Sequence, residues 1–220
     1  MKNCNSDTQQ ISPRMVRIAC IAALGMAFTL ALPQAGRADQ ATRVETVTAP
    51  DVPGNLVVEA PNVPFLLGHG VGTQNYVCLP VATGVGFVLI TPQAALFDDD
   101  FQQLTTHFFG PNPEENGFIR AAWQHSKDTS TVWGRVKDFS FDRAFVNENA
   151  IPWLLVEKKG TQAGPTGGGK LTVTTFIQRV NTVGGVAPAT ACSSPADIGR
   201  TAFVPYAADY VFYKDPTRTR

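Results

Sequence analysis

The stretch Leu171-Thr-Val-Thr-Thr-Phe-Ile-Gln-Arg-Val180 decides the fold, together with Val204-Pro-Tyr-Ala-Ala-Asp-Tyr-Val-Phe-Tyr213. In both stretches the character of the side chains alternates, which is the period of a β-strand. The mostly apolar face of the first consists of Leu171, Val173, Thr175 and Ile177. One face of the second consists of Val204, Tyr206, Ala208, Tyr210 and Phe212. Both stretches are therefore predicted to be long core strands.

Shorter runs of the same kind recur along the chain between turn signals. They cover residues 73–79, 86–91, 104–109, 118–123, 131–137 and 153–157, and a short strand is also expected at 56–59. Strands at this spacing predict an all-β fold over residues 55–213, a single-domain antiparallel β-barrel or β-sandwich with long loops. The Gly-rich segment 160–170 is expected to be one of these loops, and residues 214–220 are expected to be a polar C-terminal tail.

The charge balance excludes several classes of protein. The 220 residues include 18 Lys and Arg against 18 Asp and Glu, with 16% charged and 10% aromatic residues. A nucleic-acid-binding protein needs a clustered surplus of Lys and Arg, and no such cluster is present. The aromatic content and the low charge also exclude a disordered chain. We therefore expect a folded protein without a nucleic-acid partner.

The N-terminus is predicted to be a secretory signal peptide, residues 1–38. Basic residues precede an apolar run of 15 residues at 18–32, and Gly36-Arg37-Ala38 provides a small-residue cleavage site. A membrane span needs roughly 20 apolar residues, so cleavage is favoured over an uncleaved anchor. The mature protein is then expected to be secreted or periplasmic, without a membrane span. It would begin with an extended Pro-rich lead-in at 39–54.

Two cysteines remain after cleavage, Cys78 and Cys192. An oxidising compartment permits one pairing between them, and a disulfide is the favoured interpretation. Two alternatives stay open, a buried pair of free thiols and a redox-active cysteine. Neither alternative has the support of a Cys-x-x-Cys spacing.

Two glycine-rich motifs have incomplete nucleotide-binding signatures. Residues 164–170 have the spacing of a phosphate-binding loop, but Leu171 stands where that motif requires Ser or Thr. Gly68, Gly70 and Gly72 alternate without the third glycine of the dinucleotide fingerprint or a following helix. We therefore expect no cofactor, and an NAD-dependent dehydrogenase is effectively excluded.

No metal site is expected either. His69, His107 and His125 lack the paired spacing of zinc ligands. The acidic run at 98–100 is interpreted as a solvated turn in preference to a Ca²⁺ site.

A few polar residues are candidates for a functional site. His107 and Asp128 are the best candidates for acid or base catalysis, against the simpler interpretation of a strand-end His and a turn-capping Asp. Gln74 and Tyr76 share a strand face and are candidates to line a ligand cavity. Arg179 is in register with the apolar face of its strand. If it turns inward, its guanidinium needs a carboxylate partner or an anionic ligand.

Several longer motifs carry a family resemblance. They are Gly70-Val-Gly-Thr-Gln-Asn-Tyr-Val-Cys78, His107 with Gly110-Pro111, Asp128-Thr-Ser130, Ile151-Pro-Trp-Leu-Leu155, Thr175-Phe-Ile-Gln-Arg-Val-Asn-Thr-Val-Gly-Gly-Val-Ala-Pro188, Cys192 and Val204 to Tyr213. Through them the chain resembles, over residues 55–213, an exported domain-of-unknown-function family of bacteria and fungi. The family has no established activity, so the resemblance implies no catalytic residue.

The resemblance has three further consequences. Both cysteines match the family pattern, which implies that Cys78 and Cys192 pair. Some fungal members carry a malate dehydrogenase label, whereas this chain lacks the cofactor fingerprint. After Gly110-Pro111 the chain reads Asn112-Pro-Glu-Glu115, where the family usually has Thr-Trp.

Three functions follow from the residues, and one is favoured. The favoured one is a non-catalytic module that binds a small molecule, a glycan or a protein, because no activating constellation is visible in an aromatic-rich β scaffold. The second is a hydrolase or isomerase whose cavity is lined by Gln74, Tyr76, His107 and Arg179. The third is a structural or assembly protein of the cell envelope, which an open edge strand or a large apolar patch would favour.

Overall fold

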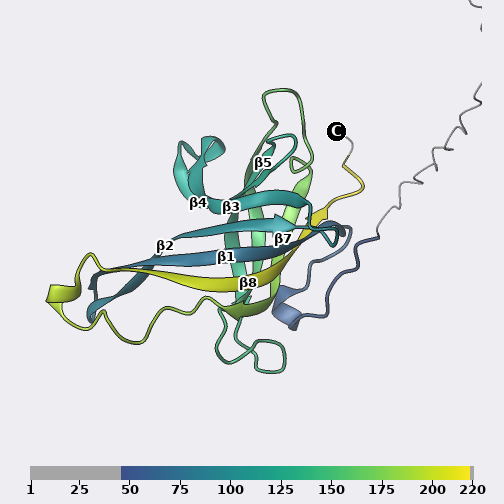
Figure 1. The fold of residues 1–220 in the computed structure, drawn as a ribbon. Helices are drawn as coiled ribbons and strands as arrows, with labels where there is room; N and C mark the ends of the chain where they lie inside the picture. The colour runs from purple at the N-terminus through teal and green to yellow at the C-terminus, as the bar shows by residue number, and fades with distance from the viewer. Residues whose placement is uncertain (1–45, 219–220) are drawn as a thin grey trace, which may run out of the picture. The chain divides into compact units, whose positions relative to one another are not determined.

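The fold was determined from a computed structural model, which describes residues 46–218. These residues form one closed antiparallel barrel in which each strand pairs with the next and β8 pairs with β1 (Figure 1). The strands are β1 (Val63–Val81), β2 (Gly84–Phe97), β3 (Gln103–Asn112), β4 (Phe118–His125), β5 (Thr131–Ser140), β6 (Trp153–Gln162), β7 (Thr174–Gly184) and β8 (Thr201–Lys214). The all-β prediction is confirmed, and the barrel is the correct choice between the two predicted architectures.

Three strands extend beyond the barrel wall as a long arm. Residues 84–93 of β2 and residues 201–205 of β8 pair with β1 alone, because the pairing of β2 with β3 begins at Ala94 and that of β8 with β7 ends at Tyr206. Figure 1 shows β1, β2 and β8 running side by side in this arm. A disulfide between Cys78 and Cys192 joins β1 to the connection between β7 and β8, as predicted.

The chain before the barrel contains one short 3-10 helix, η1 (Gly54–Leu56), where a strand at 56–59 was predicted. That prediction is wrong because Leu56 lies in the 3-10 helix and packs in an apolar cluster outside the barrel. Its side chain is fully buried against the outside of the barrel, and its carbonyl accepts a hydrogen bond from Gln178 Nε2 at 2.7 Å. The lead-in segment is thus held on the outer surface of β7. The predicted signal peptide, residues 1–38, lies outside the described residues.

The first strand begins at Val63, ten residues before the predicted start at residue 73. Sequence alternation does not reveal this part of the strand, because the glycines at 68, 70 and 72 share one face and place no side chain on it. β7 begins at Thr174, later than predicted, and an irregularity between Thr174 and Phe176 shifts its alternation. The predicted loop between β6 and β7 is confirmed from residue 163 onward, because β6 continues to Gln162. The predicted core face of β8 is buried at Tyr206, Ala208, Tyr210 and Phe212, whereas Val204 is half-buried.

The barrel has two apolar clusters, one on each side of its wall. The inner cluster fills the barrel around Leu96, Trp123, Ile177, Tyr210 and Phe212. The outer cluster packs the lead-in and the β5–β6 connection onto β6 and β7 through Leu56, Val146, Trp153, Leu155 and Val180. Apolar side chains therefore cover both faces of the wall that β6 and β7 form. Among residues 46–218, no helix is long and apolar enough to cross a membrane.

Candidate functional site

A cavity of about 490 Å³ lies inside the barrel and opens to solvent near β4 and β5. Its volume is within the range of roughly 300 to 1,000 Å³ that is typical of small-molecule sites. Each of the eight strands contributes to its lining, and most of the lining side chains are apolar or aromatic. The apolar wall includes Leu89, Pro92, Phe109, Ile119, Ala121, Trp123, Val136, Ile151, Leu154 and Val156.

Four of the predicted site residues meet in this cavity. Gln74 and Tyr76 enter it from β1, His107 from β3 and Arg179 from β7. They are separated by up to about a hundred positions in the sequence, and barrel closure brings them onto one lining. Asp128, the fifth candidate, does not line the cavity. It lies in the turn between β4 and β5 and is described separately below.

His107 is a buried and neutral imidazole. Its ring stacks on Trp123 with a centroid distance of 4.3 Å and an interplanar angle of 7°, and Tyr210 packs against it at 5.4 Å. Nδ1 lies 2.9 Å from the carbonyl oxygen of Ala122, so it carries the proton and donates. Burial lowers the His107 pKa to about 3, and the positive charge of Arg179 acts in the same direction. His107 therefore presents an aromatic face without charge at physiological pH.

The tyrosines around the cavity are also neutral. The Tyr206 and Tyr210 hydroxyls are hydrogen-bonded to each other at 3.0 Å, and burial raises the pKa of both. Tyr76 donates to the carbonyl of Gly185 at 2.7 Å, which holds its ring against the end of β7. Burial raises the Tyr76 pKa too, although Arg179 opposes the shift. The cavity thus contains hydroxyl groups without negative charge.

Arg179 is the buried cation of the cavity. It lies directly opposite Leu154 of β6 and Tyr210 of β8, and side chains directly opposite in a sheet share a face. Only 9% of the residue is exposed. Its Nη2 donates to the carbonyl of Pro152 at 2.8 Å, whereas its Nε is buried without a hydrogen-bond partner in the described part of the chain.

Two further donors of the cavity are without a hydrogen-bond acceptor among residues 46–218. Gln74 is 2% exposed, and its Nε2 makes no hydrogen bond of good geometry, although it lies near the Tyr206 hydroxyl. The indole Nε1 of Trp123 is also buried without a partner. In the described part of the chain, neither Asp nor Glu is among the residues that line the cavity. The described lining therefore has more buried donors than partners for them.

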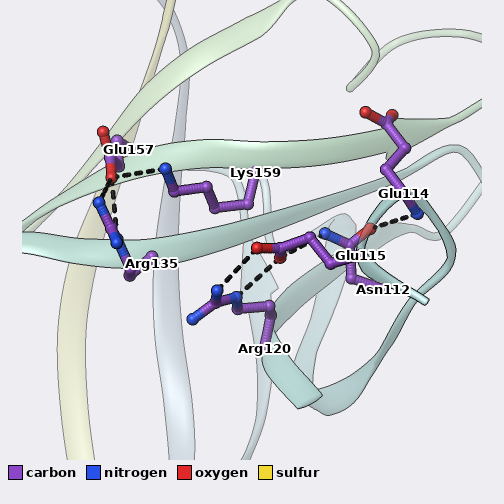
Figure 2. Close-up of polar contacts among 7 residues, drawn as sticks. All are labelled: Asn112, Glu114, Glu115, Arg120, Arg135, Glu157 and Lys159. Carbon is purple, nitrogen blue, oxygen red and sulfur yellow. Dashed lines mark hydrogen bonds and ion pairs between the residues drawn. The ribbon is translucent and has the colours of Figure 1, made fainter. Parts of the chain in front are cut away.

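The mouth of the cavity is lined by two arginines that do have carboxylate partners (Figure 2). Arg120 bonds Glu115 through Nη2 at 2.7 Å and Nε at 2.8 Å. Arg135 bonds Glu157 through Nε at 2.9 Å, and Lys159 contacts the same carboxylate at 2.9 Å. Hydrogen bonds from Arg120 and Asn112 lower the Glu115 pKa to about 2. Both rim arginines therefore face a carboxylate that is ionised at neutral pH.

The rim was not predicted, although the sequence contained a signal for part of it. Asn112-Pro-Glu-Glu115 is the segment that contains this signal. In the structure it forms the 3-10 helix η2 (Pro113–Glu115), which Asn112 caps by accepting from the Glu114 amide at 3.1 Å. An Asn-Pro-Glu-Glu run is a typical N-terminal capping sequence. This segment thus places Glu115 where its carboxylate accepts hydrogen bonds from Arg120.

Asp128 joins two connections of the barrel through hydrogen bonds to its carboxylate. Its carboxylate accepts from the Ser130 amide at 2.9 Å, from the Ser130 hydroxyl at 2.7 Å and from the Lys170 amide at 2.8 Å. Burial alone would raise the Asp128 pKa, but these hydrogen bonds outweigh it and lower the pKa to about 2. Asp128 therefore fastens the Gly-rich β6–β7 loop to the β4–β5 turn, and the structure does not bring it together with His107.

The fold and the cavity define a class, a closed eight-stranded antiparallel barrel with a solvent-open interior site. The model of a family described as a protein of unknown function (DUF3455) matches residues 59–214. The chain belongs to this family. No curated protein and no solved structure matches the chain.

Proposed function

We propose that this protein is an exported binding module that holds a small organic molecule inside its barrel. The observation that supports the proposal is the solvent-open cavity of about 490 Å³, with its largely apolar lining and its few convergent polar groups. Export is supported by the predicted signal peptide together with the Cys78–Cys192 disulfide, since such bonds persist in oxidising compartments.

The geometry gives less support to a hydrolase or an isomerase. A general base works best when its pKa is near the working pH, whereas that of His107 is about 3. Among residues 46–218, no carboxylate lines the cavity to act in its place, and Asp128 is engaged elsewhere. Binding makes no such demand on pKa. A glycan or a protein is also a poorer match, because the site is an interior cavity with mostly apolar walls.

Binding can be tested with N-phenyl-1-naphthylamine, a neutral apolar dye whose fluorescence rises in an apolar site. We expect saturable binding at one site per chain. Ala121 lines the cavity, so Ala121→Trp fills part of the cavity volume. Val136 is 46% exposed at the mouth, so Val136→Trp obstructs the entrance. Each should weaken binding by at least about tenfold, since steric exclusion removes the contacts of the dye.

The matched control is Val183→Trp, which adds the same side chain on the outside of β7 at a position that is 62% exposed. It should bind the dye like the unaltered protein. Circular dichroism and thermal unfolding verify that each variant is folded. Unchanged dye binding in both folded cavity variants would contradict the proposal.

A further inference from the structure

We infer that the ligand is an organic anion with an apolar body and a single negative head group, such as a carboxylate, that pairs with Arg179. This inference rests on the proposed function, and it concerns the charge and the shape of the bound molecule. The described lining of the cavity combines a buried guanidinium and buried hydrogen-bond donors with no carboxylate.

The first step is the charge of Arg179. A guanidinium stays protonated in proteins, so this side chain cannot avoid burial of charge by losing its proton. Arg179 forms no salt bridge in the described part of the chain, and no Asp or Glu lines the cavity beside it. An unpaired buried charge is costly, and an anion in the cavity would remove that cost.

The second step is the contrast with the other arginines of the same cavity. Arg120 and Arg135, at the mouth, pair with Glu115 and Glu157. The protein thus supplies a carboxylate to both rim arginines, whereas the more deeply buried one receives only neutral partners, the Pro152 carbonyl and the Tyr210 hydroxyl. A guanidinium binds a carboxylate through two parallel hydrogen bonds, and the free Nε of Arg179 is one of the donors for such a pair.

The third step is the excess of donors around this group. Gln74 Nε2 and Trp123 Nε1 are buried without acceptors in the described residues. Tyr210, which lines the cavity, remains protonated because burial raises its pKa, and its hydroxyl shares a hydrogen bond with that of Tyr206. Neutral groups of this kind add hydrogen-bond donors but no competing negative charge, so the interior is suited to an acceptor-rich head group.

The fourth step is the apolar wall, which specifies the rest of the ligand. Leu89, Phe109, Leu154 and Val156 line the space around the stacked rings of His107 and Trp123. Flat stacked rings favour an aromatic or a planar hydrocarbon body. A single unpaired arginine matches a single negative charge. Inorganic phosphate or a sugar phosphate would leave most of this wall without a partner.

The test compares two dyes that share one anilinonaphthalene body. N-phenyl-1-naphthylamine is neutral, and 8-anilinonaphthalene-1-sulfonate carries one negative charge. We expect the unaltered protein to bind the anionic dye at least about tenfold more tightly than the neutral dye, because the anion forms a charge-assisted pair with Arg179. Arg179→Met should abolish that preference and leave the affinity of the neutral dye within about threefold, because the side-chain stem is retained. Lys137→Met removes an exposed charge away from the cavity and should leave both affinities unchanged.

A second measurement needs no variant. In the unaltered protein, 1-naphthoate should displace the neutral dye at concentrations at least about tenfold lower than naphthalene does. Equal potency of the two competitors, or an intact preference for the anionic dye in folded Arg179→Met, would overturn this inference while leaving the proposed function in place. Failure of both dyes to bind would instead overturn the proposed function.

Discussion

His107 is a residue whose environment strongly changes its chemistry. Its pKa is about 3 in the folded barrel, compared with 6.5 for an ordinary imidazole, and burial is the largest cause. We predict that the His107 ring stays neutral from pH 8 down to 4.5. NMR titration of the imidazole carbon-bound protons measures this directly. His69 is an internal control, because its hydrogen bond to Asp209 raises its pKa above the ordinary value. A His107 transition near pH 6.5 would contradict the prediction.

The same shift predicts how stability depends on pH. Below pH 6.5 the unfolded chain takes up a proton at His107 that the folded barrel excludes, so stability falls as the pH decreases from 6.5 towards 3. This residue should account for about 1.4 kcal/mol per pH unit over that window. Urea unfolding at several pH values measures the slope. His107→Gln should make the slope shallower, whereas an unchanged slope would show that the imidazole is not the responsible group.

Replacing Asp128 tests whether this residue stabilises the fold or acts at the cavity. Asp128→Ala removes the acceptor of three hydrogen bonds and frees the loop that contains Lys170. We expect the free energy of unfolding to fall by about 1 to 3 kcal/mol, the usual effect of leaving such donors unpaired. Dye binding in the cavity should stay the same, because Asp128 does not line it. A loss of dye affinity in the folded variant would count against the purely structural position.

At the scale of the element, the alternating glycines of β1 allow the strands to approach closely. A Cβ at Gly70 would lie 2.7 Å from the ring of Tyr210, and a Cβ at Gly72 would lie 2.1 Å from the backbone oxygen of Gln93. The Tyr210 ring can rotate away from a new methyl group, whereas the Gln93 backbone of the paired strand β2 can move only if the sheet moves with it. Gly72 is therefore the more restrictive position, and the glycine alternation has a packing cause.

Substitution of these glycines tests that ranking. Gly72→Ala should destabilise the protein by about 3 kcal/mol or more, and Gly70→Ala by about 1 to 3 kcal/mol, as expected for overpacking. Gly86→Ala in β2 is the control, because its Cβ would meet Val81 at an ordinary contact distance of 3.5 Å. Chemical denaturation of the three variants measures the order. If Gly72→Ala is as stable as Gly86→Ala, the close approach of β1 and β2 is not as described.

Sequence patterns predicted the elements with clear alternation and missed those shaped by other contacts. The core face of β8 from Tyr206 to Phe212 was predictable because one side of that strand is buried throughout. The start of β1 was not, since glycines leave no pattern to detect. Leu56 was assigned to a strand because local hydrophobicity does not reveal that the lead-in packs on the outer wall through Gln178.

The four candidates Gln74, Tyr76, His107 and Arg179 were predicted to share a cavity, whereas the ion pairs at its mouth were not predicted. Arg179 was noticed because a charged side chain occurred on an apolar strand face, and its depth depends on the pairing of β7 with β8. The ion pairs at the mouth join segments such as Glu115 to Arg120 across a turn and Arg135 to Glu157 across two strands. Only the register of the closed barrel brings these groups to the rim of one cavity.

At the scale of the whole molecule, the disulfide lies on the arm and outside the cavity lining. Cys78 lies on the arm beyond Tyr76 and does not line the cavity, and its bond to Cys192 spans 114 positions of sequence. A cross-link that closes a loop of this length stabilises mainly by restricting the unfolded chain. Stability and binding should therefore respond differently when the bond is removed.

The double substitution of Ser for Cys78 and Cys192 tests this separation in the chain from residue 39 onward. The chain-entropy model gives a loss of about 4 to 5 kcal/mol in the free energy of unfolding, measured by urea denaturation. Under native conditions the dye affinity should change by less than about threefold, because the cavity walls are held by strand pairing and by the two apolar clusters. Thiol titration of the unaltered protein, unfolded without reductant, should find both sulfurs unreactive. Two reactive thiols, or a collapse of dye binding in a variant that still folds, would show instead that the bond is absent or that it supports the cavity directly.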